Sequence, residues 1–274
     1  MSTSQNQRGE RFRTLHARGT FVIANAWDGG SAKVLAGLGF AALATSSAAS
    51  AWTLGKLDGQ VLREEAFAQA RIIASATELP LAADLEKGFG DLPAAVAETI
   101  RLAATTGLVG GSIEDASGDS RHPLYEPGLA AQRVAAAAEA AHALPFPFTL
   151  TARAENFLCG NPDLDDTIRR LQSFERAGAD VLFAPGLPDL DAVRSVCSSV
   201  SRPVNFMVGM PGNSFTFADL AQAGVRRISL ATSLYRAAMT GLMSAAREVR
   251  ERGTFGFVDS PVNNGDLDAF LRSR

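Results

Sequence analysis

Short apolar runs alternate with longer amphipathic stretches along this chain, and this alternation constrains the fold more than any other feature. Eight runs fit buried strands, at residues 21–26, 42–47, 79–86, 108–114, 148–155, 181–185, 203–208 and 227–231. Each precedes a stretch with helical spacing, at residues 31–38, 63–77, 93–106, 129–143, 164–177, 190–200, 217–223 and 233–252. Apolar strands that alternate with helices form parallel sheets covered by those helices. Eight such units predict an α/β fold, a closed (β/α)8 barrel of the TIM type.

An open, doubly wound sheet is the alternative architecture. It would place a glycine-rich phosphate loop after its first strand, and the segment Asn-Ala-Trp-Asp-Gly-Gly-Ser at residues 25–31 does not match that fingerprint. A length of 274 residues suits a single barrel. We therefore expect one domain over residues 1–274, with a barrel core at about 21–252 and a C-terminal extension at 253–274.

Composition narrows the classes of partner. A net charge of −3 and the absence of a Lys/Arg cluster with interleaved aromatic residues argue against a nucleic-acid surface. No apolar run reaches the roughly 18 residues of a membrane span, and the N-terminus is polar. The two cysteines, Cys159 and Cys197, are spaced unlike a zinc site and are expected to be reduced thiols. We expect a cytoplasmic protein that binds a small molecule, with no nucleic-acid or membrane partner.

Two carboxylates end the third predicted strand. Asp84 and Glu86 are separated by one residue, so a strand would aim both to the same face. Ionised carboxylates about 5 Å apart repel by roughly 3 kcal/mol at an effective dielectric near 20, unless a cation or a shared proton lies between them. We interpret the pair as part of a divalent metal site. A strand that ends in solvated acids is the alternative interpretation.

Ligands of such barrels bind at the carboxyl ends of the strands. Polar residues gather at these predicted ends, namely Thr45, Ser46, Ser47, Asp84, Glu86, Ser112, Glu114, Thr151, Arg153, Glu155 and Asn205. Any one of them could instead cap a helix. Several acids that converge with one arginine are typical of a functional site rather than of caps. Trp52, in the stretch after the second strand, is a further candidate for substrate binding.

Two neighbouring strands contribute the next candidates. Glu114 is the natural third acid, whereas Asp115 should face the opposite way and anchor the structure. Arg153 shares a face with Glu155, which could orient it. A buried arginine beside acids pairs with them or with an anionic ligand, and we favour the ligand.

Two loops hold the remaining candidates. The polar, glycine-containing segment 116–123 could form a lid that carries His122 into the site, although an exposed loop histidine is usually only solvated. Asp58 precedes Gly59, and Asp-Gly is a common turn pair. Asp28 should cap the helix that begins near Ser31.

These motifs, in this order, resemble those of the isocitrate lyase and phosphoenolpyruvate mutase superfamily over residues 21–252. The resemblance rests on the segments 25–31, 44–47, 57–59, 84–90, 112–115 and 151–153. It implies a modified β/α barrel whose last helix is exchanged between the subunits of a homodimer or homotetramer. That helix would be residues 233–252 or the segment after it.

The resemblance also implies a chemistry. Mg²⁺, with Mn²⁺ as a substitute, would be held by Asp84, with Glu86 and Glu114 helping directly or through water and Asp58 nearby. The substrate would be a small 2-oxo carboxylate whose anionic ends contact Arg153 and the backbone around residues 45–47. The reaction would stabilise a metal-bound enolate while a C–C or C–P bond breaks. Asp58, Glu114, Arg153 and His122 are then the expected catalytic residues, and Thr45, Ser46, Ser47, Trp52, Arg153 and Asn205 the expected substrate contacts.

One departure narrows the reaction. Isocitrate lyases carry a cysteine that acts as general acid in the loop after the Glu114 position, and this chain has none between Ala116 and His122. The second acid is also Glu86, where many relatives have aspartate. Decarboxylation of an oxaloacetate-like acid fits best, because carbon dioxide leaves without a proton donor. A phosphonopyruvate-type C–P hydrolase or mutase is the alternative enzyme, and a non-catalytic 2-oxo acid binding protein is the alternative of a different class.

Overall fold

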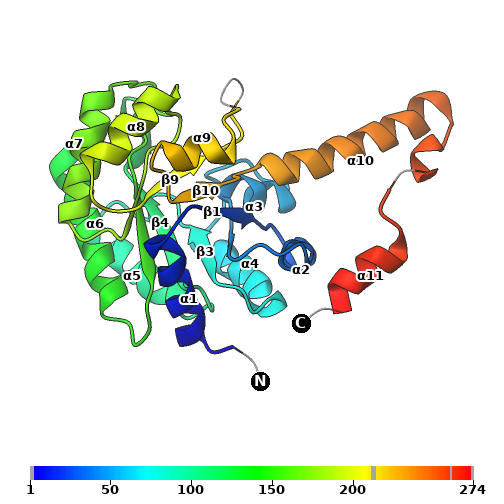
Figure 1. The fold of residues 1–274 in the computed structure, drawn as a ribbon, viewed down its shortest axis with the longest axis horizontal. Coiled ribbons are helices and arrows are strands. Elements are labelled where there is room, and N and C mark those ends of the chain that lie inside the picture. Colours follow the sequence, from blue (N-terminus) through cyan, green and yellow to red (C-terminus); the bar gives the residue numbers. More distant parts are fainter. Residues whose placement is uncertain (1–2, 211–213, 260, 273–274) are drawn as a thin grey trace.

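Eight parallel strands close into a barrel in the computed structural model, which describes residues 3–210, 214–259 and 261–272 (Figure 1). Residues 1–2, 211–213, 260 and 273–274 belong to the predicted domain but lie outside the described residues. Around the barrel the strands follow the order β1, β10, β9, β8, β7, β4, β3 and β2. Their bounds are β1 Phe21–Asn25, β2 Leu43–Ala44, β3 Leu81–Asp84, β4 Gly110–Glu114, β7 Thr149–Arg153, β8 Val181–Phe183, β9 Val204–Met207 and β10 Arg227–Ser229. The predicted TIM-type barrel is confirmed. The extent of the domain, 1–274, stays a prediction.

A ring of helices covers the barrel, and most follow the predicted stretches. They are α2 Gly29–Gly37, α4 Arg63–Ala76, α5 Pro93–Ala104, α6 Pro127–His142, α7 Leu164–Arg176, α8 Leu190–Ser199 and α9 Phe217–Gln222. Helix α10, Ser233–Arg252, also follows its predicted stretch but does not belong to this ring. The additional elements are α1 Gln5–Ala17, α3 Ser47–Thr53, the 3-10 helix η1 Gly256–Asp259 and α11 Asn264–Arg272. Asp28 caps α2 as predicted, since its carboxylate accepts a hydrogen bond from the Ser31 N–H at 2.6 Å.

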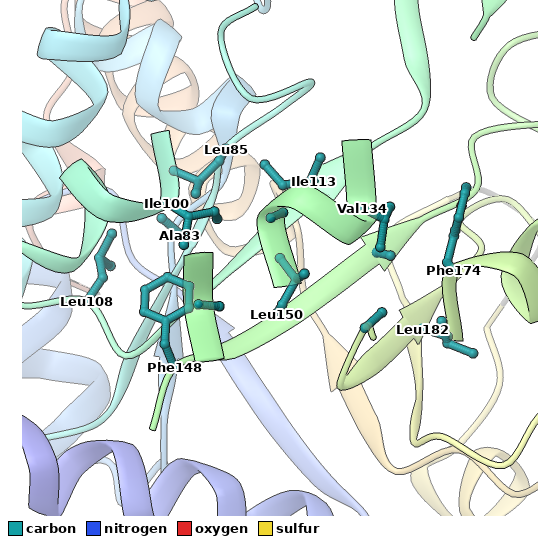
Figure 2. Packing of buried hydrophobic residues seen from close by; sticks show 14 of the residues in the cluster. Ala83, Leu85, Ile100, Leu108, Ile113, Val134, Phe148, Leu150, Phe174 and Leu182 are labelled. Carbon is teal, nitrogen blue, oxygen red and sulfur yellow. The ribbon is translucent and has the colours of Figure 1, made fainter. Parts of the chain in front are cut away.

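The apolar core lies between the strands and the helices. Figure 2 shows the part of it where side chains of β3, β4, β7 and β8 meet those of α5, α6 and α7. Leu150 and Ile100 there are fully buried. Removing such a side chain from water contributes roughly 1.5–3 kcal/mol. This layer fixes the strand directions, and hence the positions of the side chains that point into the barrel.

Helix α1 closes the lower end of the barrel, where the strands begin. Its Phe12 is fully buried and packs against Ile23 and Val109. A Cβ atom added to Gly110 would lie 2.8 Å from the Phe12 ring, so only glycine leaves room for this plug. The barrel interior is therefore reached from the carboxyl ends of the strands.

The C-terminal helices leave the barrel and return to it. Helix α10 extends away from the body of the molecule and buries none of its residues against the described part of the chain (Figure 1). Helix α11 comes back to α2, where the Lys33 ammonium donates to the carbonyl of Leu271 at 2.6 Å. The Phe270 ring covers Gly37 so closely that a Cβ atom there would lie 2.3 Å from it.

The segment predicted as a lid is a hairpin. Strands β5, Ala116–Asp119, and β6, His122–Leu124, pair antiparallel between β4 and α6. Among the helices described, none has the length and apolar character needed to cross a membrane.

Candidate active site

A cavity of about 290 Å³ opens at the carboxyl ends of the barrel strands. Seven of the predicted site residues line it, namely Thr45, Ser46, Ser47, Asp58, Asp84, Arg153 and Asn205. Glu86 and Glu114 adjoin the cavity without belonging to its lining; Glu86 faces a small cleft that it shares with Asp84. Together with the other lining residues, all eight strands contribute to the cavity, as the strand-end argument predicted.

Arg153 lies at the centre of the acidic cluster. Its Nη1 is 3.0 Å from Asp84 Oδ1, its Nη2 is 3.3 Å from Glu114 Oε2, and its Nε is 2.8 Å from Glu155 Oε1. The register explains this, because Arg153 lies directly beside Glu114 on paired strands β7 and β4. Glu155 orients Arg153, as expected. In the structure Arg153 pairs with acidic side chains, and binding of an anionic ligand by Arg153 stays a prediction.

Asp84 is held by hydrogen bonds from every side. Its Oδ1 accepts from the Ser112 hydroxyl and from the Glu86 N–H, both at 3.3 Å, and its Oδ2 accepts from the Ser47 N–H at 3.4 Å. Burial raises the pKa of Asp84, but the Arg153 charge and these donors outweigh it, so the pKa lies below its usual range. Asp84 is therefore an anion at neutral pH.

Glu86 departs from the strand geometry that the sequence predicted. Strand β3 ends at Asp84, and Glu86 has a left-handed backbone with φ of 50°. The two-residue alternation is therefore wrong as the reason for the proximity of the two acids, although each still feels the other's charge. Burial, together with the charges of Asp84 and Asp58, raises the pKa of Glu86 to about 7.

Glu114 adds a further carboxyl group to the acidic cluster around Arg153. Burial, with the charges of Glu155, Asp84 and Glu86, raises the pKa of Glu114 well above its usual range despite the opposing charge of Arg153. Asp58, exposed at the rim, hydrogen bonds with Ser47 and also feels the charge of Asp84. One guanidinium thus faces more carboxylates than it can neutralise.

The donor set fits a hard divalent cation. Among the described residues, no three acidic, histidine or cysteine side chains are grouped so as to hold a metal ion by themselves. Mg²⁺ commonly takes one or two carboxylates and keeps several waters. Asp84 could act as the direct ligand, with Glu86 and Glu114 placed for contact through water.

Two predicted site residues are not brought to the cavity. His122 is exposed on the β5–β6 hairpin and does not line it. Trp52 lies on α3, is 37% exposed, and its ring centroid is 5.5 Å from that of Tyr235 at the start of α10. A histidine in a hairpin strand is held by backbone pairing, so it differs from the mobile lid residue that the loop composition favoured.

Asp115 confirms its predicted structural role. It is 2% exposed, and it accepts from the Glu155 N–H at 2.8 Å and from Arg170 Nη1 at 3.0 Å. Burial raises the pKa of Asp115 to about 6, against the effect of these donors. It joins the end of β4 to β7 and α7 on the side away from the cavity.

The polar cavity residues that were not singled out from the sequence include Asn25, Arg227 and Ser229. Arg227 begins an apolar run, and Ser229 follows it two residues later. A polar residue at the inward positions of a barrel strand is the signal that could have identified them.

The barrel and its acid-lined mouth agree with the expected superfamily of isocitrate lyases and phosphoenolpyruvate mutases. Residues 12–250 match the family model described as Phosphoenolpyruvate phosphomutase, and the chain belongs to that family. An uncharacterized protein of Mycobacterium tuberculosis is 32% identical over 88% of this chain and 89% of its own length. The oxaloacetate decarboxylase of Pseudomonas entomophila is 28% identical over 86% of this chain and 82% of its own.

Solved structures agree with this assignment. A protein of Burkholderia cenocepacia J2315, provisionally described as a lyase/mutase, is 48% identical and superposes with a TM-score of 0.96 over 98% of this chain and 97% of its own. A 2,3-dimethylmalate lyase has the same fold, with a TM-score of 0.87 at 24% identity. The predicted superfamily is thereby confirmed.

Proposed function

We propose that this protein is a Mg²⁺-dependent carbon–carbon lyase that acts on a small 2-oxo acid of the oxaloacetate kind. The observation that carries the proposal is the position of Arg153 among Asp84, Glu114 and Glu155 at the mouth of the cavity. The similarity to an oxaloacetate decarboxylase supports it. The bond to be broken lies next to a carbonyl in such substrates, so the reaction requires charge stabilisation on one oxygen.

The chain's own residues would supply part of that stabilisation. When bound, Mg²⁺ would act as a Lewis acid toward the substrate's oxygens. Arg153 would hold the anionic end of the substrate, and its position is fixed in advance by three carboxylates, so it does not need to reorganise during the reaction. The N–H of Ser47, at the start of α3, donates to Asp84 Oδ2 at 3.4 Å and so helps to fix this carboxylate.

Decarboxylation is the reaction that requires the fewest catalytic groups from the protein. The hairpin after β4 contains no cysteine, so the general acid expected for isocitrate cleavage is absent from it. Carbon dioxide leaves without a proton, and water can protonate the remaining fragment. Hydrolysis or rearrangement of a C–P bond, and binding without turnover, remain the alternative functions.

An assay of oxaloacetate and phosphonopyruvate, with Mg²⁺ and with a chelator, tests the proposal. We expect Mg²⁺-dependent release of pyruvate from oxaloacetate, and a loss on the order of 100-fold in kcat/KM in Asp84→Asn. Mn²⁺ binding followed by its paramagnetic resonance should weaken in the same variant. Asp191→Asn, which alters an exposed pair on α8, is the matched control. Phosphate release would favour the C–P alternative, and unchanged Mn²⁺ binding would refute the metal site.

We also propose that the protein is a homodimer or homotetramer in which α10, or the segment after it, covers a neighbouring subunit. Leu242, Met243 and Val249 are exposed on this helix. Exposed apolar side chains in series favour a protein partner. Light scattering after gel filtration should give a mass above 28.8 kDa, and Leu242→Glu should lower it. A cytoplasmic location stays a prediction.

A further inference from the structure

Arg227 crosses the floor of the cavity. It begins β10 and is 6% exposed, and its guanidinium reaches three other elements. Nε donates to Asn205 Oδ1 at 2.7 Å, Nη2 donates to Thr151 Oγ1 at 3.0 Å, and Nη1 lies 3.3 Å from Nε2 of His16. The side chain is therefore fixed by β9, β7 and α1 while it still lines the cavity.

All three partners are uncharged. His16 accepts from Arg227 at Nε2, so its proton lies on Nδ1, which donates to the Phe12 carbonyl at 2.8 Å. Burial and the charge of Arg227 lower the pKa of His16 to about 3, which keeps the ring neutral. Arg153, the other arginine that lines the cavity, pairs with three carboxylates. Away from the cavity, Arg170 pairs with two carboxylates, and the buried Arg133 donates to backbone carbonyls.

A buried guanidinium with only neutral partners carries a charge that nothing in its surroundings offsets. Arg227 forms no ion pair with any described carboxylate, and burial lowers its pKa to about 9, still above neutrality. Burial of such a cation is unfavourable unless an anion joins it. Each terminal nitrogen also has one N–H beyond those used by His16 and Thr151. Because Arg227 lines the cavity, an anion bound in the cavity could reach its guanidinium.

The two arginines meet the cavity at different depths. Thr151, which touches Arg227, and Arg153 are two residues apart on β7, so their Cα atoms are about 6.6 Å apart along the strand. Both point into the barrel. A ligand with its 2-oxo acid end at Arg153 would extend downward, past Asn205 and Ser229, toward Arg227.

We propose that Arg227 forms an anion subsite on the cavity floor, which holds the distal carboxylate of a 2-oxo dicarboxylate bound at its other end by Arg153 and Asp84. This inference rests on the proposed function of the upper site and specifies its substrate class. A carboxylate at this position would supply the counter-charge that Arg227 lacks.

Binding of two acids of equal chain length tests the subsite. Calorimetry in the presence of Mg²⁺ would compare 2-oxoglutarate with 2-oxopentanoate, which lacks the distal carboxylate. We expect the wild-type protein to prefer the diacid on the order of 10- to 100-fold. Arg227→Met should reduce that preference to about one while leaving the affinity for 2-oxopentanoate, and the Mn²⁺ resonance signal, unchanged.

Two further variants complete the experiment. Arg227→Lys, which keeps the charge, should retain part of the preference, and Arg226→Met, an exposed neighbour on the other side of the strand, should retain all of it. Equal wild-type affinity for the two acids would overturn the subsite without affecting the metal site, and needs no variant to fold. A preference that survives in a folded Arg227→Met would overturn it too. Loss of Mg²⁺-dependent binding of both acids would refute the proposed function itself.

Discussion

Arg153 donates from Nη1 to Oδ1 of Asp84 over 3.0 Å, and so joins the ends of β7 and β3 across the intervening strand β4. The same guanidinium contacts Glu114 on that intervening strand. Three adjacent strands are therefore fastened at the mouth of the barrel by one cation. This gives Arg153 a role in stability as well as its proposed role in substrate binding.

Replacing Arg153 with methionine should be strongly destabilising. Three largely buried carboxylates would lose their counter-charge, and removing one partner of such a network costs about 3–5 kcal/mol. The acids would then have pKa values raised above those of the unfolded chain, so the loss is full above these values and shrinks as the pH falls through them. Urea unfolding at pH 8 and pH 5 measures this. Equal destabilisation at both pH values would contradict the account.

Glu114 and Asp115 are adjacent residues on opposite sides of one strand, and their amide variants should have opposite effects. Glu114→Gln should lower kcat/KM by 10- to 100-fold with little change in stability, because this carboxyl group adjoins the proposed metal site. Asp115→Asn should lower the free energy of unfolding by roughly 2–4 kcal/mol, since it weakens a buried pair with Arg170. Turnover and thermal unfolding of both variants distinguish these roles.

His122→Ala should leave turnover within about twofold of the wild type. The side chain is exposed on the hairpin and does not line the cavity, and surface substitutions of this kind change stability by no more than about 0.5 kcal/mol. Steady-state kinetics at saturating and limiting substrate tests this. A large loss in kcat would restore His122 as a proton donor and imply that the hairpin closes over the site.

His16 should make the protein sensitive to acid. Its pKa is lowered to about 3 in the folded state and is 6.5 in the unfolded chain, which therefore binds the extra proton between these values. The contribution of His16 to the free energy of unfolding is fully present above pH 6.5. It falls by about 1.4 kcal/mol for each pH unit below that value, until about pH 3. His16→Gln can keep both hydrogen bonds without titrating. Unfolding measured from pH 7 to pH 5 should be flatter in this variant by roughly 2 kcal/mol.

The sequence was sufficient to predict the barrel, because each strand and helix carries its own apolar period. It also placed Asp84 and Arg153 together, since parallel strands bring their carboxyl ends to one face. It could not predict the left-handed turn at Glu86 or the hairpin around His122, which depend on tertiary contacts. The role of Arg227 could not be predicted for a related reason. Its partners Thr151, Asn205 and His16 are distant in sequence, and only the closed barrel brings them together.

Phe12 and His16 pack together at the lower end of the barrel, below the cavity, so a ligand would enter and leave through the mouth at the carboxyl ends of the strands. The end of the substrate that binds near Arg227 must enter first. After cleavage, the fragment at Arg227 lies deeper than the fragment nearer the mouth. Release is then sequential, with the upper fragment departing first. Product-inhibition patterns, which report the order of product release, would therefore indicate which end of the substrate binds near Arg227.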